Sequence, residues 1–342
     1  MIHFRKRLNI IDIFKALFFF KKINLSQWKK KSEQKSLFTS KSSWSILLIG
    51  IWVKKIKKKN PVFLVPDYYC NYSLNLLRIL GAQIHFYPIN KNFEADLNLI
   101  DLSIKPDVLI ATHYFGKEQD FSIFNIFCDA NNIWLVEDAT HCLKQNGKIS
   151  NHGHFVIFSQ HKFFPNINGA LLLLNEKKLS EFDVASFGHK TTWLNSLETF
   201  VLEKNIHTYN NNLRTIFNII YDNMIKIFMK EKIKNFTDDD INQKKYPNPN
   251  IDFLSYKILT YFSYKTGLIS DYRNRCHLIM EHSLNCLFNK EDYEILSNTD
   301  FDPYLLIIKS NNKIKEIYNS LKNLGFAIQT WPDLPTDIKL KS

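Results

Sequence analysis

The stretch from residue 133 to residue 174 reads IWLVEDATHCLKQNGKISNHGHFVIFSQHKFFPNINGALLLL. It contains three short apolar runs, IWLVED (133–138), HFVIFS (154–159) and GALLLL (169–174). Apolar residues at consecutive positions are typical of strands that are buried on both faces of a mainly parallel sheet. The stretch therefore predicts three central strands of an α/β fold.

The sequence before this stretch continues the same pattern. We expect strands at 61–66, 83–89 and 107–116, and helices over 71–80 and 121–131. Such alternation is typical of a parallel sheet whose strands are joined by helices. Ligands bind at the carboxyl ends of the strands in these sheets, so functional side chains are expected there.

The sequence after this stretch predicts helices and a smaller α+β region. Residues 195–235 read as helix, 237–252 as a polar linker or loop, and 254–288 as helix again. A strand is expected over 303–309 and a helix over 312–324. The expected domains are a basic N-terminal segment (1–37), a large domain (38–240) and a small C-terminal domain (241–342).

Composition indicates a folded chain of enzyme size. The 342 residues are 45% hydrophobic and include 28 Phe, 15 Tyr and 6 Trp, which excludes a disordered chain. Only 9 Gly are present, and neither GxGxxG nor GxxxxGK[ST] occurs, which argues against a glycine-rich phosphate loop. The 5 Cys never form a CxxC pair, so a reducing cytoplasm is expected, and a disulfide framework is not.

The chain is basic, with 45 Lys and Arg against 33 Asp and Glu and a net charge of +12. The charge gathers in runs at 29–35, 54–59 and 226–234. These runs are either solvated helix faces or contacts for an anionic partner. Nucleic acid is not expected, because no zinc finger, RNA-binding signature or basic zipper occurs.

The first residues, MIHFRKRLNIIDIFKALFFFKK (1–22), join basic side chains to an apolar run. Asp12 and Lys15 interrupt the run and no small-residue cleavage site follows, so a signal peptide is not expected. No stretch reaches the roughly 18 apolar residues of a membrane helix. The segment is still compatible with a peripheral contact with a membrane surface.

Polar side chains lie where two of the expected strands end. Asp138 ends the strand 133–138, and Lys162 follows the strand 154–159. Lysine forms Schiff bases when its amine is deprotonated, and aspartate can keep a pyridine nitrogen protonated. The pair is therefore compatible with pyridoxal phosphate. Taken alone, these residues are more often a helix cap and a lysine that forms an ion pair or lies in solvent.

Seven segments resemble, in order, parts of the DegT/DnrJ/StrS-type sugar aminotransferases. They are SKSSWSILL (40–48), VFLVPDYYCNYSLNLLRILGAQIHFYPI (62–89), VLIATHYFGK (108–117), IWLVEDATH (133–141), FSQHKFFPNINGALLL (158–173), DYRNRCHLIMEHSL (271–284), and PYLLIIK (303–309) with LGFAIQTWPDLP (324–335). The resemblance implies the aspartate-aminotransferase-type fold, pyridoxal phosphate fold type I, with a large domain on a mainly parallel sheet and a small C-terminal α+β domain. It also implies a homodimer that transfers an amino group from a donor such as glutamate to a keto-sugar, most often nucleotide-linked.

The resemblance assigns roles to individual residues. Lys162 matches the Schiff-base lysine and Asp138 the partner of the pyridine nitrogen. His141 matches the Gln or His near the cofactor's phenolic oxygen. Ser42 and Ser43 match the residues whose backbone N–H groups hold the phosphate at a helix start. Ser159 adds a hydroxyl close to the lysine.

The sequence departs from the family pattern at four places. Ser40-Lys41-Ser42-Ser43 lacks the usual glycine, and the position that stacks a ring on the cofactor reads Cys70, although Tyr69 is its neighbour. Ile157-Phe158 replaces Ser-Phe, and Gly169-Ala170 replaces Gly-Gly. These departures support an alternative: a non-catalytic component of a surface-polysaccharide pathway, which the basic N-terminal segment could associate with a membrane.

Three other positions have weaker signals. His113 ends a strand and is either a structural histidine or a ligand contact. His152 and His154 resemble a metal pair, but no third ligand has suitable spacing, so no metal site is expected. Arg273 could reach a substrate carboxylate or phosphate, but a solvated helix face is the default expectation for it.

Overall fold

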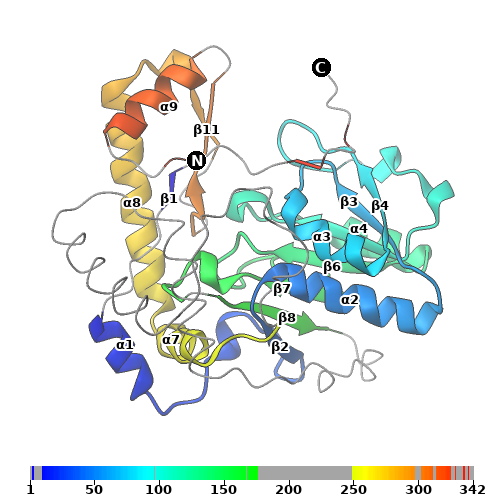
Figure 1. The fold of residues 1–342 in the computed structure, drawn as a ribbon. Helices are drawn as coiled ribbons and strands as arrows, with labels where there is room; N and C mark the ends of the chain where they lie inside the picture. Colours follow the sequence, from blue (N-terminus) through cyan, green and yellow to red (C-terminus); the bar gives the residue numbers. More distant parts are fainter. Residues whose placement is uncertain are drawn as a thin grey trace, which may run out of the picture.

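The computed structural model describes residues 2–3, 10–95, 97–166, 168–175, 249–296, 302–310, 313–324, 328, 334–335 and 338 (Figure 1). The helix expected over 195–235 and most of the segment 237–252 lie outside these residues. The expected domain boundary between residues 240 and 241 also lies outside them.

A seven-stranded sheet forms the centre of the molecule. Its strands are β2 (Lys35–Thr39), β3 (Val62–Pro66), β4 (Gln83–Tyr87), β5 (Val108–Thr112), β6 (Trp134–Ala139), β7 (Phe155–Phe158) and β8 (Ala170–Leu174). Their order in space is β2-β8-β7-β6-β5-β3-β4. Neighbours from β7 to β4 are parallel, and β8 is antiparallel to both β7 and β2. The expected mainly parallel α/β sheet is therefore confirmed.

Helices cover both faces of this sheet (Figure 1). Helices α2 (Ser42–Lys57) and α3 (Asn71–Leu80) pack on one face. The opposite face is covered by α1 (Ile10–Leu17), α4 (Ser122–Ala130) and α7 (Phe253–Ser263). Successive strand residues alternate between the two covered faces, as Leu64 and Val65 do in β3. Burial on both sides explains why the strands are apolar at consecutive positions.

Local sequence sets the ends of the helices. α3 ends at Gly81, whose φ of 81° is accessible to glycine at little steric cost. α7 begins after Asp252, whose carboxylate accepts the N–H of Ser255 at 2.9 Å. Gly81 and Asp252 each lie next to the helix that they end or begin, so such signals can be recognised in the sequence. The bounds of α3 match the helix expected over 71–80.

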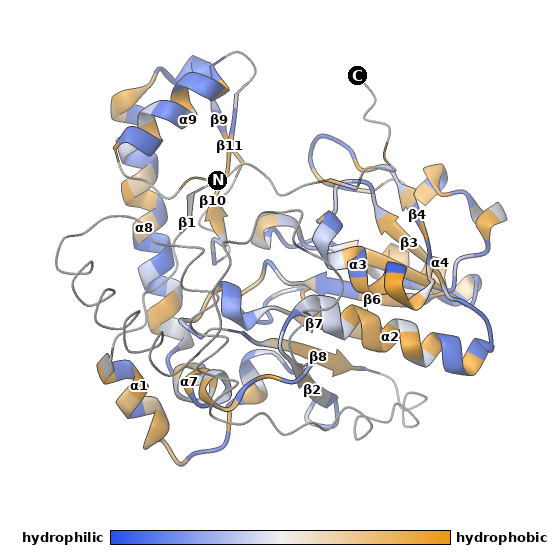
Figure 2. Ribbon diagram, in the orientation of Figure 1, coloured by the Kyte–Doolittle hydropathy of each residue, from blue (hydrophilic) through white to orange (hydrophobic). Residues whose placement is uncertain are grey.

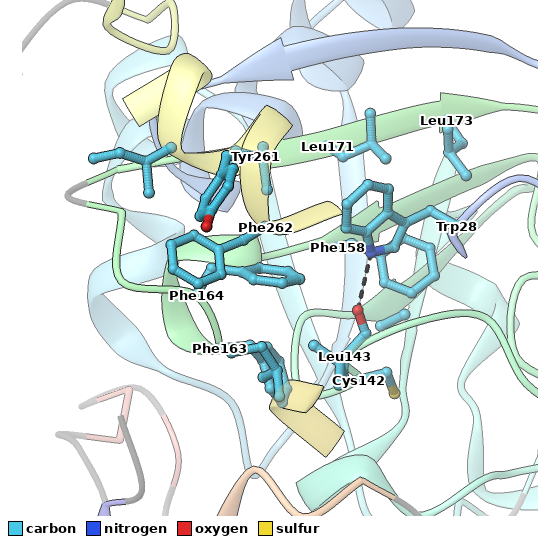
Figure 3. Packing of buried hydrophobic residues seen from close by; sticks show 14 of the residues in the cluster. Trp28, Cys142, Leu143, Phe158, Phe163, Phe164, Leu171, Leu173, Tyr261 and Phe262 are labelled. Carbon is cyan, nitrogen blue, oxygen red and sulfur yellow. Dashed lines mark hydrogen bonds between the residues drawn. The ribbon is translucent and has the colours of Figure 1, made fainter. Parts of the chain in front are cut away.

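The described part of the N-terminal segment packs against the sheet. Trp28 is buried, its ring lies 6.1 Å from that of Phe164, and its indole N–H donates to the carbonyl of Leu143 at 2.9 Å (Figure 3). Ala16 of α1 belongs to the same hydrophobic cluster. A boundary between residues 37 and 38 would cut strand β2. Residues 10–34 thus share a core with the sheet.

The C-terminal residues form an α+β region beside the sheet. It contains α8 (Thr266–Leu287), α9 (Ile314–Asn323), β9 (Glu294–Ile295), β10 (Leu305–Leu306) and β11 (Ile308–Lys309). β11 pairs with β9, and β10 pairs with β1 (Ile2–His3). The helix expected over 254–288 is two helices, and the strand expected over 303–309 is two short strands. Within the described part of the chain, no helix combines the length and apolar character needed to cross a membrane.

Candidate active site

Asp138 lies at the carboxyl end of β6 and is 3% exposed. Its Oδ1 accepts the N–H of Thr140 at 2.9 Å, and its Oδ2 accepts the hydroxyl of Tyr69 at 2.6 Å. Burial and the neighbouring Asp138 charge raise the pKa of Tyr69 well above its usual value. The tyrosine therefore keeps the proton that it donates, and two donors fix the carboxylate in place.

Lys162 ends the short 3-10 turn that follows β7. Its Nζ donates to Thr140 Oγ1 at 3.3 Å, and the N–H of Thr140 holds Asp138. Nζ also lies 5.2 Å from the centre of the Tyr304 ring. The structure thus brings the expected lysine and aspartate together through Thr140, a residue that the sequence analysis did not single out.

His141 is stacked between two aromatic rings. The Phe115 ring lies 5.8 Å away at 8°, and the Tyr304 ring lies 4.7 Å away at 18°. The N–H of Phe115 donates to His141 Nδ1 at 3.2 Å. Burial and the Lys162 charge lower the pKa of His141 well below its usual value. The ring is therefore neutral near pH 7, and Nε2 carries the proton that can be donated to a ligand oxygen.

The turn that supports His141 requires a glycine. Gly116 has φ of 87°, and a Cβ there would lie 3.1 Å from the carbonyl oxygen of His141 and 3.2 Å from that of Asp302. Both atoms belong to the backbone, so neither can move away easily. Gly116 therefore lets the turn approach the site.

We expect Gly116→Ala to lower the free energy of unfolding by about 1–3 kcal/mol, because alanine disfavours this φ and its Cβ meets two carbonyl groups. Gly267→Ala is the matched control. Gly267 lies in α8, where an added Cβ would meet no described residue outside its own helix within 4 Å. This control should be neutral or should stabilise by up to about 1 kcal/mol. Urea denaturation measures both variants, and equal losses would contradict the prediction.

The start of α2 lies beside the loop that carries the lysine. The carbonyl of Ser40 accepts the N–H of Gly169 at 2.7 Å, and the carbonyl of Gly169 accepts the N–H of His161 at 3.1 Å. α2 begins at Ser42 without a side-chain cap hydrogen bond. Ser42 and Ser43 therefore offer first-turn N–H groups at a helix start, which favours an anion.

Two buried side chains next to this loop carry polar atoms with no hydrogen-bond partner among the described residues. They are the hydroxyl of Ser40 and both amide atoms of Gln160, and each residue is 1% exposed. Burying such atoms unpaired is costly. Unpaired polar atoms beside a helix start are compatible with an anion such as a phosphate there.

The remaining expected residues lie around this centre. The Ser159 hydroxyl is 3.2 Å from Nδ1 of His161, within the lysine loop. Cys70 is half-buried at the N-cap of α3, and it is its neighbour Tyr69 that contacts Asp138.

The expectation for Arg273 is wrong, because this residue is buried and not on a solvated helix face. Its Nε donates to the carbonyl of Pro303 at 2.8 Å, and its Nη2 donates to that of Tyr304. Its guanidinium lies 4.7 Å from the centre of the Phe163 ring. Burial lowers the pKa of Arg273 to about 10, so the side chain stays charged near pH 7. Arg273 thereby fixes the backbone of Tyr304, whose ring lies near Nζ of Lys162.

An apolar cavity of about 640 Å³ adjoins the site. Tyr68, Phe93 and Phe115 line it from the strand-end loops, and residues of β11 and α9 line it from the C-terminal region. A space of about 290 Å³ shares Phe93 and Phe115 and includes lysines 91, 117 and 309. Because Phe115 stacks on His141, a ligand in the cavity would lie beside the centre.

No protein-family model matches the sequence, and no curated protein matches it. Many solved structures do match the fold. PseC of Helicobacter pylori, an aminotransferase involved in the biosynthesis of pseudoaminic acid, has a TM-score of 0.63 and 12% identity over 99% of this chain and 86% of that chain. The sugar aminotransferase Spr1654 of Streptococcus pneumoniae, in its PMP form, has a TM-score of 0.59 and 14% identity over 98% and 86%. A DegT DnrJ EryC1 StrS aminotransferase from Brucella abortus has a TM-score of 0.56 and 13% identity over 89% and 73%.

At these identities the comparison shows the fold. The expected aspartate-aminotransferase-type fold is confirmed. The structures that share it include members of the family whose motifs the sequence resembles.

Proposed function

We propose that this chain is a pyridoxal-phosphate-dependent aminotransferase that acts on a nucleotide-linked keto-sugar in surface-polysaccharide or related biosynthesis. The observation that carries the proposal is the arrangement of Lys162 and Asp138 around Thr140 at the ends of β6 and β7. The shared fold supports it, because Spr1654 was solved in its PMP form and PseC is an aminotransferase involved in the biosynthesis of pseudoaminic acid.

The residues at the site suit the cofactor's functional groups. Asp138 would accept a hydrogen bond from the protonated ring nitrogen, and Nε2 of His141 would donate one to the phenolic oxygen. The N–H groups of Ser42 and Ser43, with the Ser40 hydroxyl, would hold the phosphate. Bound at this site, pyridoxal phosphate would supply an electron sink for the carbon that bears the transferred amine once the amino donor has displaced Lys162 from it.

The chain's own acid–base group in this proposal is the Lys162 amine. It would take the proton from the substrate carbon and return it, acting as general base and then general acid. Thr140 and Tyr304 hold this amine in place. The neutral ring of His141 adds no positive charge beside it.

The cavity beside the site indicates where the substrate binds, and the cysteines indicate the cellular compartment. The cavity beside Phe115 gives room for the part of the substrate beyond the reacting carbon, and Lys91 in the adjoining space suits an anionic portion, whereas Lys117 and Lys309 are paired with Glu94 and Glu294. We place the reaction in the cytoplasm because all five cysteines are free thiols. We also propose that the chain forms a homodimer. We further propose that it divides into a large sheet domain and a small domain that contains α8 and α9.

The reaction of the cofactor-loaded protein with glutamate is a direct test of this function. The purified chain is loaded with pyridoxal phosphate, mixed with glutamate, and assayed for 2-oxoglutarate and for loss of the cofactor's visible absorbance. We expect a stoichiometric amount of 2-oxoglutarate, and continued turnover once a nucleotide-linked keto-sugar is added. Failure to bind the cofactor at saturation would refute the enzymatic proposal and favour the non-catalytic alternative.

A further inference from the structure

Helix α1 turns an apolar face away from the protein. Asp12 and Ala16 are buried on the side that faces α7. Ile11 and Phe14, one turn apart, are exposed on the other side together with Lys15. Figure 2 shows α1 as a mainly apolar helix at the edge of the molecule. Its outer face therefore leaves apolar side chains in water.

The three phenylalanines that follow α1 continue this surface. Phe18 is 69% exposed and Phe20 is 84% exposed. Phe19 between them points inward, and its ring meets those of Tyr261 and Tyr264 edge-on at 5.5 and 5.3 Å. Because α7 anchors Phe19, the two outer rings are held in an exposed position.

Lysines surround these apolar side chains. Lys15, Lys21 and Lys22 are exposed on the same segment, and Nζ of Lys257 lies 5.4 Å from the Phe20 ring centre. Residues 10–24 and α7 contain a single acidic side chain, Asp12, which is buried. The exposed charges of these elements are therefore all positive.

We propose that this surface docks on an anionic lipid membrane. The α1 platform, as we name it, consists of Ile11, Phe14, Lys15, Phe18, Phe20, Lys21 and Lys22. Aromatic and aliphatic side chains enter the boundary between headgroups and acyl chains, while lysines contact anionic headgroups. The same platform of a second copy suits this surface less well, because two cationic platforms would repel each other. The proposal is independent of the aminotransferase activity.

Sedimentation of the full chain with lipid vesicles tests the proposal. We expect binding to phosphatidylcholine vesicles that contain phosphatidylglycerol, weak binding to phosphatidylcholine alone, and weaker binding as salt is added. Phe14→Ser with Phe18→Ser should reduce the vesicle affinity at least about tenfold, because burying one phenylalanine is worth more than a factor of ten. Lys15→Glu with Lys21→Glu should remove the preference for phosphatidylglycerol.

A matched pair of isoleucines on α4 provides the control. Ile123 and Ile126 are 65% and 69% exposed, so Ile123→Ser with Ile126→Ser removes similar apolar surface elsewhere. This variant should bind vesicles like the parent, and thermal unfolding should show that all variants are folded. Absence of binding to phosphatidylglycerol vesicles, or an equal loss in the α4 variant, overturns the proposal. A platform variant that changes the oligomer mass and leaves vesicle binding intact overturns it in favour of a second copy.

Discussion

Lys162→Ala is expected to abolish the visible absorbance of a lysine-bound cofactor and to slow amino transfer at least about a thousandfold. General acid–base catalysis alone contributes about 10²–10⁴-fold, and the variant loses the covalent attachment as well. The measurements are a titration with pyridoxal phosphate followed by absorbance, and the rate of 2-oxoglutarate formation from glutamate. Added methylamine should restore part of the rate, because a free amine can replace the missing proton carrier.

Lys148→Ala is the control for this experiment. Lys148 is half exposed and forms an ion pair with Asp120 on the surface, so its variant should keep both the absorbance and the rate. Reduction of the loaded parent with borohydride, followed by peptide mass spectrometry, should find the cofactor on the peptide that contains Lys162. Retention of the band in Lys162→Ala would show that another residue holds the cofactor.

The central strands could be predicted from sequence because helices cover both of their faces. Leu109 and Ile110 of β5 face opposite layers, so neither position needs a polar residue. β2 could not be predicted in the same way. It begins with Lys35 and Ser36 at the edge of the sheet, and it is a strand because it pairs with β8. That partner lies more than a hundred residues later in the chain, so no local pattern indicates it.

The positions of Asp138 and Lys162 could also be predicted, because the carboxyl ends of neighbouring parallel strands meet at one edge of a sheet. Their roles remain a proposal. The contacts of Tyr69 and Tyr304 with these residues could not be predicted, since they depend on how distant loops return to that edge. Burial of Arg273 likewise depends on how α8 packs beneath the Tyr304 segment.

Glu137, the neighbour of Asp138, is a buried carboxylate with a structural role. Nε2 of His113 lies 3.0 Å from its Oε1, and the N–H of Gln119 donates to the other ring nitrogen, so Nε2 carries the proton. Backbone N–H groups at residues 150, 152 and 153 donate to the same carboxylate. These contacts favour a structural role for His113 over contact with a ligand.

We expect Glu137→Ala to lower the free energy of unfolding by about 3–5 kcal/mol, because each buried donor left without its charged acceptor costs about 1–3 kcal/mol. His113 and three backbone N–H groups would lose their acceptor. Glu94→Ala is the control: Glu94 is exposed and pairs with Lys117 at 3.4 Å, so it should cost at most about 1 kcal/mol. Urea denaturation at neutral pH measures both, and similar losses would show that the Glu137 contacts are weak.

The pH dependence of the free energy of unfolding provides a second test of Glu137. Burial alone would raise the pKa of Glu137, but the hydrogen bonds from His113 and from the N–H groups of Gly153 and Ser150 outweigh it and lower this pKa. A carboxyl group whose pKa is lower in the folded than in the unfolded chain stabilises the fold above the unfolded value, about 4.3 for glutamate. That contribution is lost as the pH falls through the folded value. The free energy of unfolding should therefore fall more steeply with acid in the parent than in Glu137→Gln, which has no carboxyl group to protonate. Parallel pH profiles would mean that the pKa of Glu137 is the same in both states and that its buried contacts do not depend on its charge.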